Sequence, residues 1–255
     1  MKKYMVISLV FLIASIDGHA QDTKIIHVYV ALCDNVNQGI VPVSRSLGNG
    51  QNPKTNLYWG ALYGVKTHFK RSGDWEYLGS LLNGNPKILE RVLFKHRETG
   101  TYLLADAYDG SEIKQATIDF LKAASGKDQE KLILDKQGLY FGGGADLVAY
   151  VGHDGLMEFE LDIELEPDDD AKRDAIVLAC FSKDYFKPYI KNTGANPLVW
   201  STGLMSPEAY TLKQAIDGWI SGETDAQIRE RAAAAYHQYQ KCGMRGARRL
   251  LVTGY

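Results

Sequence analysis

Cys180 and His153 are the residues of this chain whose chemistry and position together indicate catalysis. Cys180 follows the apolar segment 175–179, and His153 follows the apolar segment 146–151 after one glycine. A thiolate is a strong nucleophile, and an imidazole accepts and donates protons near neutral pH. If the two segments are neighbouring parallel strands, both side chains leave the same sheet edge. The pair then predicts nucleophilic acyl transfer, with nearby backbone N–H groups stabilising the oxyanion. A helix starting after Cys180 would lower the pKa of its thiol.

The elements that position this pair follow from hydrophobic patterning, because buried strands and amphipathic helices differ in period. We expect strands at 25–32, 90–95, 102–108, 146–151, 175–179 and 197–201. We expect helices at 57–69, 110–124, after residue 180, at 207–222 and at 225–243. Segment 157–166 alternates apolar and acidic residues, which predicts one more strand with an acidic outer face. The alternation of strands and helices predicts an α/β fold, with a mostly parallel central sheet and helices on both faces.

Residues 1–20 have the pattern of a signal peptide. Two lysines precede an apolar run at 5–16, and Ala20 ends a small-residue cleavage pattern. The run is shorter than the roughly 20 residues that a transmembrane helix needs. We therefore expect export to the periplasm or the extracellular space. The mature chain, 21–255, shows no internal repeat, linker or membrane span and is predicted to form a single domain.

Composition excludes some partners and leaves the state of the thiols open. The net charge of −2 lacks the basic excess typical of nucleic-acid binding. Three cysteines are an odd number, so at least one thiol stays unpaired within an exported chain. A Cys33–Cys242 disulfide would leave Cys180 free, and the alternative is that Cys33 and Cys242 are both buried thiols. The sequence does not define the oligomeric state.

The segments around Cys180 and His153 resemble motifs of the caspase–gingipain–legumain group of cysteine peptidases. They read Leu147-Val-Ala-Tyr-Val-Gly-His153-Asp-Gly155 and Ala175-Ile-Val-Leu-Ala-Cys180. The predicted order of elements over 25–180 is also similar to the caspase-like core. The resemblance implies a three-layer sandwich, with Cys180 as nucleophile, His153 as general acid and base, and the N–H groups near Gly155 and Cys180 as oxyanion donors. It implies a peptide or protein substrate and no metal or other cofactor.

The resemblance also implies a substrate pocket, and it is incomplete at two positions. Stretch 198–203 lies where the group often places pocket residues, which makes Ser201 and Thr202 candidates together with Asp34. Asp154 stands directly after the histidine, where the group usually has glycine. Leu178, two residues before the cysteine, replaces a commonly polar residue, so no charged preference is implied. A non-catalytic protein of the same fold, binding a peptide or a cell-envelope partner, is the alternative.

Two other motifs resemble ligand sites, but each favours a structural interpretation. Loop 48–55 nearly matches a phosphate-binding loop, but Pro53 replaces the second glycine and removes an N–H that phosphate would need. The acidic cluster at 164–170 could hold calcium, yet it lacks the spacing of an EF-hand loop. We expect an ordinary surface or substrate-facing loop at 48–55 and a solvated edge at 164–170. The histidines show no metal-ligand spacing, so no metal site is expected.

Overall fold

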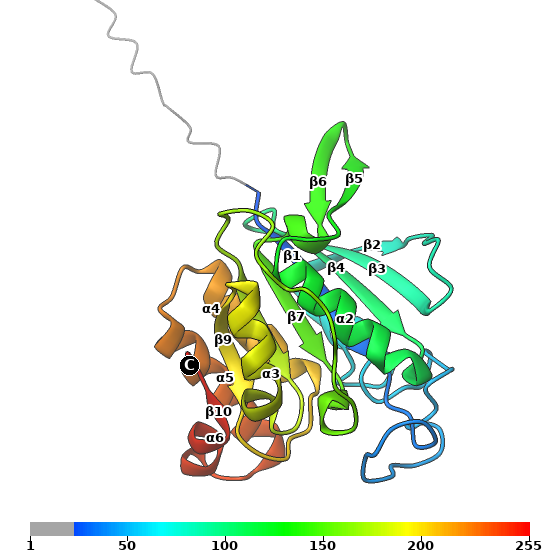
Figure 1. Cartoon of the computed structure of the whole chain (residues 1–255), viewed down its shortest axis with the longest axis vertical. Coiled ribbons are helices and arrows are strands. Elements are labelled where there is room, and N and C mark those ends of the chain that lie inside the picture. Colours follow the sequence, from blue (N-terminus) through cyan, green and yellow to red (C-terminus); the bar gives the residue numbers. More distant parts are fainter. Residues whose placement is uncertain (1–22) are drawn as a thin grey trace, which may run out of the picture.

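A computed structural model describes residues 23–255 of the chain (Figure 1). The signal peptide predicted for residues 1–20 lies outside the described residues. No helix within the described range is long and apolar enough to cross a membrane.

An eight-stranded sheet in the order β10-β9-β8-β7-β1-β4-β3-β2 forms the centre of the fold. The strands are β1 (Ile25–Ala31), β2 (Trp75–Ser80), β3 (Ile88–His96), β4 (Tyr102–Tyr108), β7 (Leu147–Val151), β8 (Asp174–Leu178), β9 (Asn196–Ser201) and β10 (Leu251–Val252). From β9 to β4 in this order, neighbouring strands pair in parallel, and β10, β3 and β2 extend the two edges through antiparallel pairs. The predicted α/β class with a mostly parallel sheet is confirmed.

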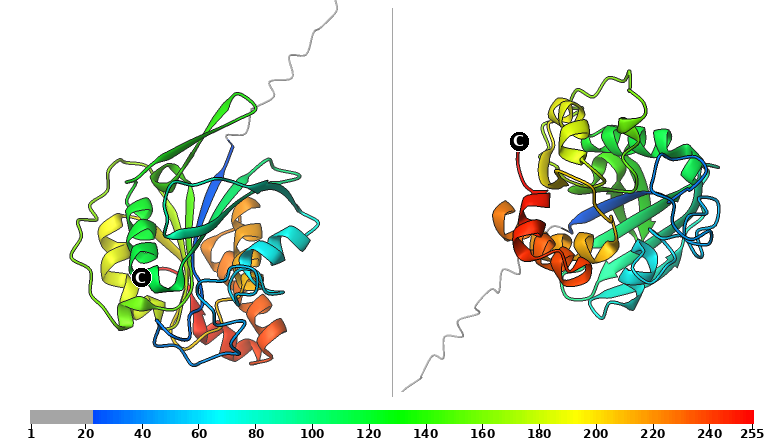
Figure 2. Two further views of the ribbon diagram at one scale, coloured as in Figure 1. Left: turned by 90° about the vertical axis from the view of Figure 1, so that its right-hand side faces the viewer. Right: turned by 90° about the horizontal axis from the view of Figure 1, so that it is seen from below.

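Helices cover both faces of this sheet, which gives three layers (Figure 2). One face carries α1 (Val65–Arg71), α4 (Ala209–Ile220) and α5 (Asp225–Gln240), and the other carries α2 (Ile113–Ala124) and α3 (Ser182–Thr193). The period of two along each strand divides the side chains between the faces. In β8, Ile176 and Leu178 point towards α4 and α5, whereas Ala175 and Val177 point towards α2 and α3.

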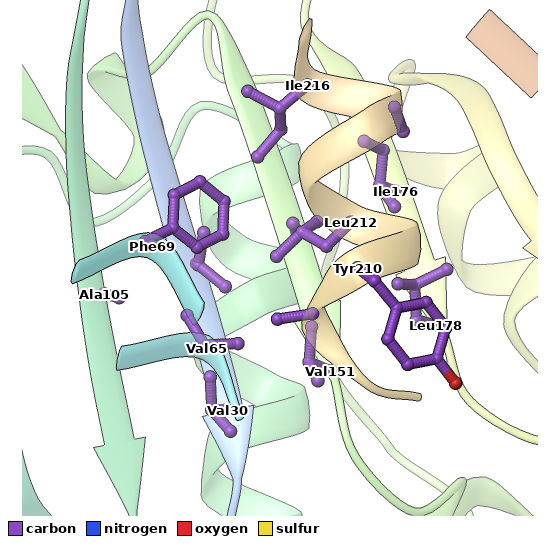
Figure 3. Packing of buried hydrophobic residues seen from close by; sticks show 14 of the residues in the cluster. Val30, Val65, Phe69, Ala105, Val151, Ile176, Leu178, Tyr210, Leu212 and Ile216 are labelled. Atoms are coloured by element: carbon purple, nitrogen blue, oxygen red, sulfur yellow. The ribbon is translucent and has the colours of Figure 1, made fainter. Parts of the chain in front are cut away.

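The core on the α4 side explains why the central strands read as continuous apolar runs. Val30 of β1, Val151 of β7 and Ile176 of β8 belong to one buried cluster with Leu212 and Ile216 of α4 (Figure 3). All five are fully buried. Burial of each such side chain contributes about 1.5–3 kcal/mol. Because a second helical layer covers the opposite face, neither face of these strands has polar residues in alternation.

The strand predicted at 157–166 is wrong. Residues Gly155–Met157 form the short 3₁₀ helix η3, and the chain then runs on without pairing in the sheet. The sheet offers no place for it, because β7 already has β1 and β8 as neighbours. The alternation instead reflects packing on the α2–α3 layer, where Leu165 is buried and Leu161 donates its N–H to the Tyr189 hydroxyl at 3.1 Å. The acidic residues between them are exposed, as predicted.

Other elements differ from the sequence prediction in extent. The helix predicted at 57–69 begins only at Val65, because Asn56 holds the preceding turns through hydrogen bonds with the backbone of Cys33 and Tyr58. A two-stranded antiparallel hairpin lies between α2 and β7. The elements that prediction missed are β2, β5 (Glu130–Leu134), β6 (Gln137–Phe141), η2 (Gly142–Gly144), α6 (Met244–Leu250) and β10, and the start of the predicted helix 110–124 is the 3₁₀ helix η1 (Gly110–Glu112).

Candidate functional site

The strands that precede the candidate pair are neighbours. β7 and β8 pair in parallel, with Val151 opposite Leu178. His153 and Cys180 each follow by two residues, so both leave the same edge of the sheet. By strand parity both positions belong to the face that α4 and α5 cover. The adjacency on which the catalytic hypothesis depends is confirmed.

His153 and Cys180 line one cavity of about 380 Å³. Its walls come from the loop after β1 (within 39–43), from residues 57–58, from the loop after β9 (204–207) and from Tyr236 and Gln240 of α5. Ligand pockets in open α/β sheets are expected outside the carboxyl ends of the strands, which is where this cavity lies. It therefore combines a nucleophile, a base and enclosed space.

Cys180 lies in the tight turn between β8 and α3. Phe181 adopts a left-handed conformation, with φ of 50°, which reverses the chain directly after the cysteine. Ser201 of the neighbouring strand holds this turn, since its hydroxyl donates to the Ala179 carbonyl and accepts the Ser182 N–H at 3.2 Å. The turn thus fixes the direction in which the thiol leaves the sheet.

The thiol of Cys180 is partly buried, and its polar neighbour is the backbone of Met205. Sγ accepts the Met205 N–H at 3.3 Å and lies 3.5 Å from the Met205 carbonyl oxygen. Burial raises the pKa of the Cys180 thiol, and the Met205 N–H only partly opposes this. The pKa is thus raised, and not lowered as we expected from the following helix. The thiol is therefore protonated at neutral pH and needs a base to react.

His153 has a carboxylate partner that the sequence did not reveal. Its Nε2 lies 2.7 Å from Oε1 of Glu158, and the same oxygen accepts the Gly39 N–H at 2.7 Å. A hydrogen bond from Nε2–H to a carboxylate selects the tautomer in which Nδ1 is unprotonated. Nδ1 has no hydrogen-bond partner within residues 23–255. It is therefore the nitrogen that can accept a proton.

Glu158 was missed because the alternation of 157–166 placed it in a row of solvent-facing acids. The sequence signal that could have revealed the position of Glu158 was Asp154-Gly155, because this pair is typical of turns. Asp154 caps η3 by accepting the Leu156 N–H at 3.1 Å, and this short helix returns Glu158 towards the histidine.

Gly155 is buried but does not line the cavity. A Cβ atom at this position would lie 2.6 Å from the ring of Phe159, so the glycine permits close packing there. Within residues 23–255, the backbone N–H groups of Asp154 and Cys180 donate no hydrogen bond. The backbone N–H groups of His153 and Gly155 are likewise free within this range, so the oxyanion donors predicted near Gly155 and Cys180 stay a prediction.

The predicted pocket residues Asp34, Ser201 and Thr202 do not line this cavity. Asp34 is buried and organises the loop after β1, accepting the Val36 N–H at 2.9 Å and the Asn37 side-chain N–H at 2.8 Å. Ser201 supports the Cys180 turn. The Thr202 hydroxyl donates to the Arg249 carbonyl at 2.7 Å and so ties β9 to α6. The cavity wall begins two residues later, at Leu204.

All three cysteines are free, so the Cys33–Cys242 disulfide, one of the two alternatives left open by the sequence, does not form. Cys33 is buried beneath the first loop, whereas Cys242 is exposed at the end of α5. The alternative, that Cys33 and Cys242 are both buried thiols, is therefore correct for Cys33 and wrong for Cys242. Burial raises the pKa of Cys33 to about 11, which makes it an unreactive packing thiol.

The remaining motifs are structural. Asp169 of the acidic cluster forms a bidentate pair with Arg173, with both N–O distances 2.7 Å. In the part of the chain that the structure describes, no group of three or more His, Cys, Asp or Glu side chains is arranged to hold a metal ion. In loop 48–55, the Lys54 N–H donates to Asn52 Oδ1 at 3.1 Å, and no helix follows directly.

The geometry that favours a function is thus a thiol and an imidazole at one cavity, with a carboxylate behind the imidazole. Comparisons with protein-family models, with curated proteins and with solved structures found no match to this chain.

Proposed function

We propose that this chain is a cysteine-dependent amide hydrolase acting on peptides, with Cys180 as nucleophile and His153 as general base and acid. The observation that carries the proposal is that both side chains line the same cavity while Glu158 holds Nε2 of the histidine. A nucleophile, a base and a third group that orients the base form a constellation that recurs on unrelated folds. The caspase-like resemblance of the two motifs points to the same chemistry.

The first half of the reaction acylates the enzyme. Nδ1 of His153 takes the proton of the Cys180 thiol as sulfur attacks the carbonyl carbon of the peptide bond. The carbonyl electron pair moves to oxygen, and the free N–H groups of Asp154, Gly155 and Cys180 are the proposed donors to that oxyanion. When the carbonyl re-forms, the C–N bond breaks, the histidine gives its proton to the leaving amine, and a thioester remains on Cys180.

The second half releases the product. Water gives one proton to Nδ1 and its oxygen attacks the thioester carbonyl. The C–S bond then breaks, the thiol regains a proton, and a carboxylic acid leaves. Water is the only co-reactant. Glu158 holds the ring through Nε2 in both halves and stabilises the imidazolium that forms in each.

The alternative function is a non-catalytic peptide- or envelope-binding protein. Two observations favour it: burial raises the pKa of Cys180, and no hydrogen bond joins Cys180 to His153 among the described residues. In this case the cavity would bind a peptide without covalent chemistry. With the export predicted from residues 1–20, either activity would take place outside the cytoplasm, and cell fractionation would test that location.

Incubation of the purified protein with a mixture of unmodified peptides, followed by mass spectrometry, tests the proposal. We expect cleavage by the wild type and a loss of at least about 1,000-fold in Cys180→Ala and His153→Ala. Cys242→Ala, which removes an exposed thiol outside the cavity, is the matched control and should cleave like the wild type. Equal cleavage by Cys180→Ala would overturn the mechanism. Peptide binding by wild type and Cys180→Ala alike, with no cleavage by either, would establish the alternative.

A further inference from the structure

The cavity beside Cys180 has no charged wall. Among the residues that the structure describes, no Asp, Glu, Lys or Arg side chain lines it. Placing a charged substrate side chain there would remove its hydration without supplying an ion-pair partner, which costs several kcal/mol. Oε1 of the nearby Glu158 carboxylate is occupied by His153 and by the Gly39 N–H, and Glu158 is not among the residues that line the cavity.

The lining of the cavity is mostly apolar. Ile40, Val43 and Leu57 form one part of the wall and are themselves packed against the core. Val41 and Leu204 stand at its rim with exposed fractions of 82% and 69%. Large apolar side chains exposed around a cavity are typical of a surface that a ligand covers.

The polar groups of the wall are largely engaged with the protein. The Tyr236 hydroxyl accepts the Ser206 N–H at 3.2 Å, and the Ser206 hydroxyl donates to Glu208 at 3.0 Å. The side-chain amide of Gln240 donates to the Tyr210 hydroxyl at 2.6 Å. They therefore offer little to a charged group that enters the cavity.

We infer that the cavity selects an uncharged apolar side chain, of the class of leucine, methionine or phenylalanine, on the acyl side of the bond that is cleaved. This inference rests on the proposed function. The acyl-side residue stays bonded to Cys180 in the thioester, so its side chain occupies the space next to Sγ. A volume of about 380 Å³ accommodates a large side chain with part of its backbone.

Fluorogenic peptides that differ only in the acyl-side residue test the inference. We expect kcat/KM for leucine, methionine or phenylalanine to exceed that for aspartate, arginine or lysine by at least about 100-fold. Cys180-dependent cleavage that favours a charged residue would overturn the inference and leave the proposed function standing. Absence of Cys180-dependent cleavage of every peptide would instead refute the proposed function, and the inference with it.

Rim variants test whether this cavity is responsible for the preference. Leu204→Glu introduces a carboxylate at an exposed position, so the fold should tolerate it. We expect it to shift the ratio of kcat/KM for arginine over leucine upwards by at least about tenfold. Leu82→Glu is the matched control, since Leu82 is fully exposed and lies outside the cavity wall. A similar shift in both variants, or none in Leu204→Glu, would assign the preference to another surface.

Peptidyl chloromethyl ketones provide a measurement that does not need turnover. The Cys180 sulfur displaces chloride and retains the peptide, and mass spectrometry locates the adduct. We expect the leucine probe to label Cys180 at least about tenfold faster than the aspartate or arginine probe. Equal rates, or faster labelling by a charged probe, would contradict the inference.

Discussion

The Nε2 atom of His153 lies 2.7 Å from Oε1 of Glu158, and this contact determines which ring nitrogen carries the proton. With Nε2–H bonded to the carboxylate, Nδ1 is the proton acceptor. The carboxylate itself is about one-third exposed, so water screens its charge in part. Its contribution is therefore mainly to orient the ring.

Glu158→Ala should lower kcat about 10- to 100-fold and leave KM nearly unchanged, because the ring loses its orienting partner while the cavity wall remains. Glu158→Gln keeps an acceptor oxygen and should recover part of the loss. Steady-state kinetics with an apolar substrate measure both. Glu160→Gln, an exposed neighbour, is the control, and equal losses in the 158 and 160 variants would refute the orienting role.

Alkylation of Cys180 should be slow at neutral pH and should accelerate as the pH rises beyond about 8.5, which is the ordinary pKa of a cysteine thiol. The reason is that burial raises the pKa of this thiol, so the reactive thiolate forms late. Iodoacetamide labelling of Cys242→Ala protein, followed by mass spectrometry across pH, gives the profile. A rate that is already constant below pH 7 would show a preformed thiolate and contradict this expectation.

Asp154 should make the fold less stable as the pH rises. Burial raises its pKa to about 7, and its Oδ2 has no hydrogen-bond partner among the residues that the structure describes. Because the folded pKa lies above the unfolded value near 3.9, the folded state binds the proton more tightly. The resulting stabilisation is complete below about pH 4 and is lost as the pH rises through 7.

Asp154→Asn keeps the acceptor for the Leu156 N–H and removes the ionisation. We expect its advantage in unfolding free energy over the wild type to grow between pH 4 and pH 8, by up to about 4 kcal/mol. Urea unfolding at several pH values measures it. A difference that does not change with pH would show that Asp154 stays ionised in the folded protein.

Asp106 is a buried carboxylate in a network of charged and polar side chains, on the face of the sheet that α2 and α3 cover. Burial alone would raise its pKa, but hydrogen bonds from Arg91 and His27 more than offset this and lower it. Arg91 contacts it through Nε at 2.6 Å and Nη2 at 2.7 Å.

Arg91→Met leaves this carboxylate without its main partner and should cost about 3–5 kcal/mol in urea unfolding. The exposed pair of Arg248 and Glu230 provides the comparison, and Arg248→Met should change stability little. Similar losses in the two variants would show that the buried network contributes no more than a surface ion pair.

The central strands could be predicted from sequence because both faces of each are buried. β1, β4, β7 and β8 appear as short apolar runs that end at polar residues, and this alone located the edge where His153 and Cys180 emerge. The amphipathic helix α2 could be predicted for the same reason, because the period of its apolar residues shows which side is buried.

The rest of the site could not be predicted, because it depends on contacts between distant segments. Tyr236 and Leu204 reach the cavity only through the packing of α5 and of the loop after β9. The alternation at 157–166 correctly indicated burial on one side, but it does not require pairing in a sheet. The strand predicted there therefore hid the contact of Glu158 with His153. Ser201 and Thr202 are near the cavity in sequence, but their hydroxyls bond to the backbone.

Gly39 shows how far the requirements of the base extend into a surface loop. A Cβ atom at this exposed position would lie 2.1 Å from Oε1 of Glu158, so even alanine would push the carboxylate aside. The oxygen that steadies His153 also fastens the loop that borders the cavity. One methyl group, on a residue with no chemistry of its own, would thereby disturb both hydrogen bonds of that oxygen at once.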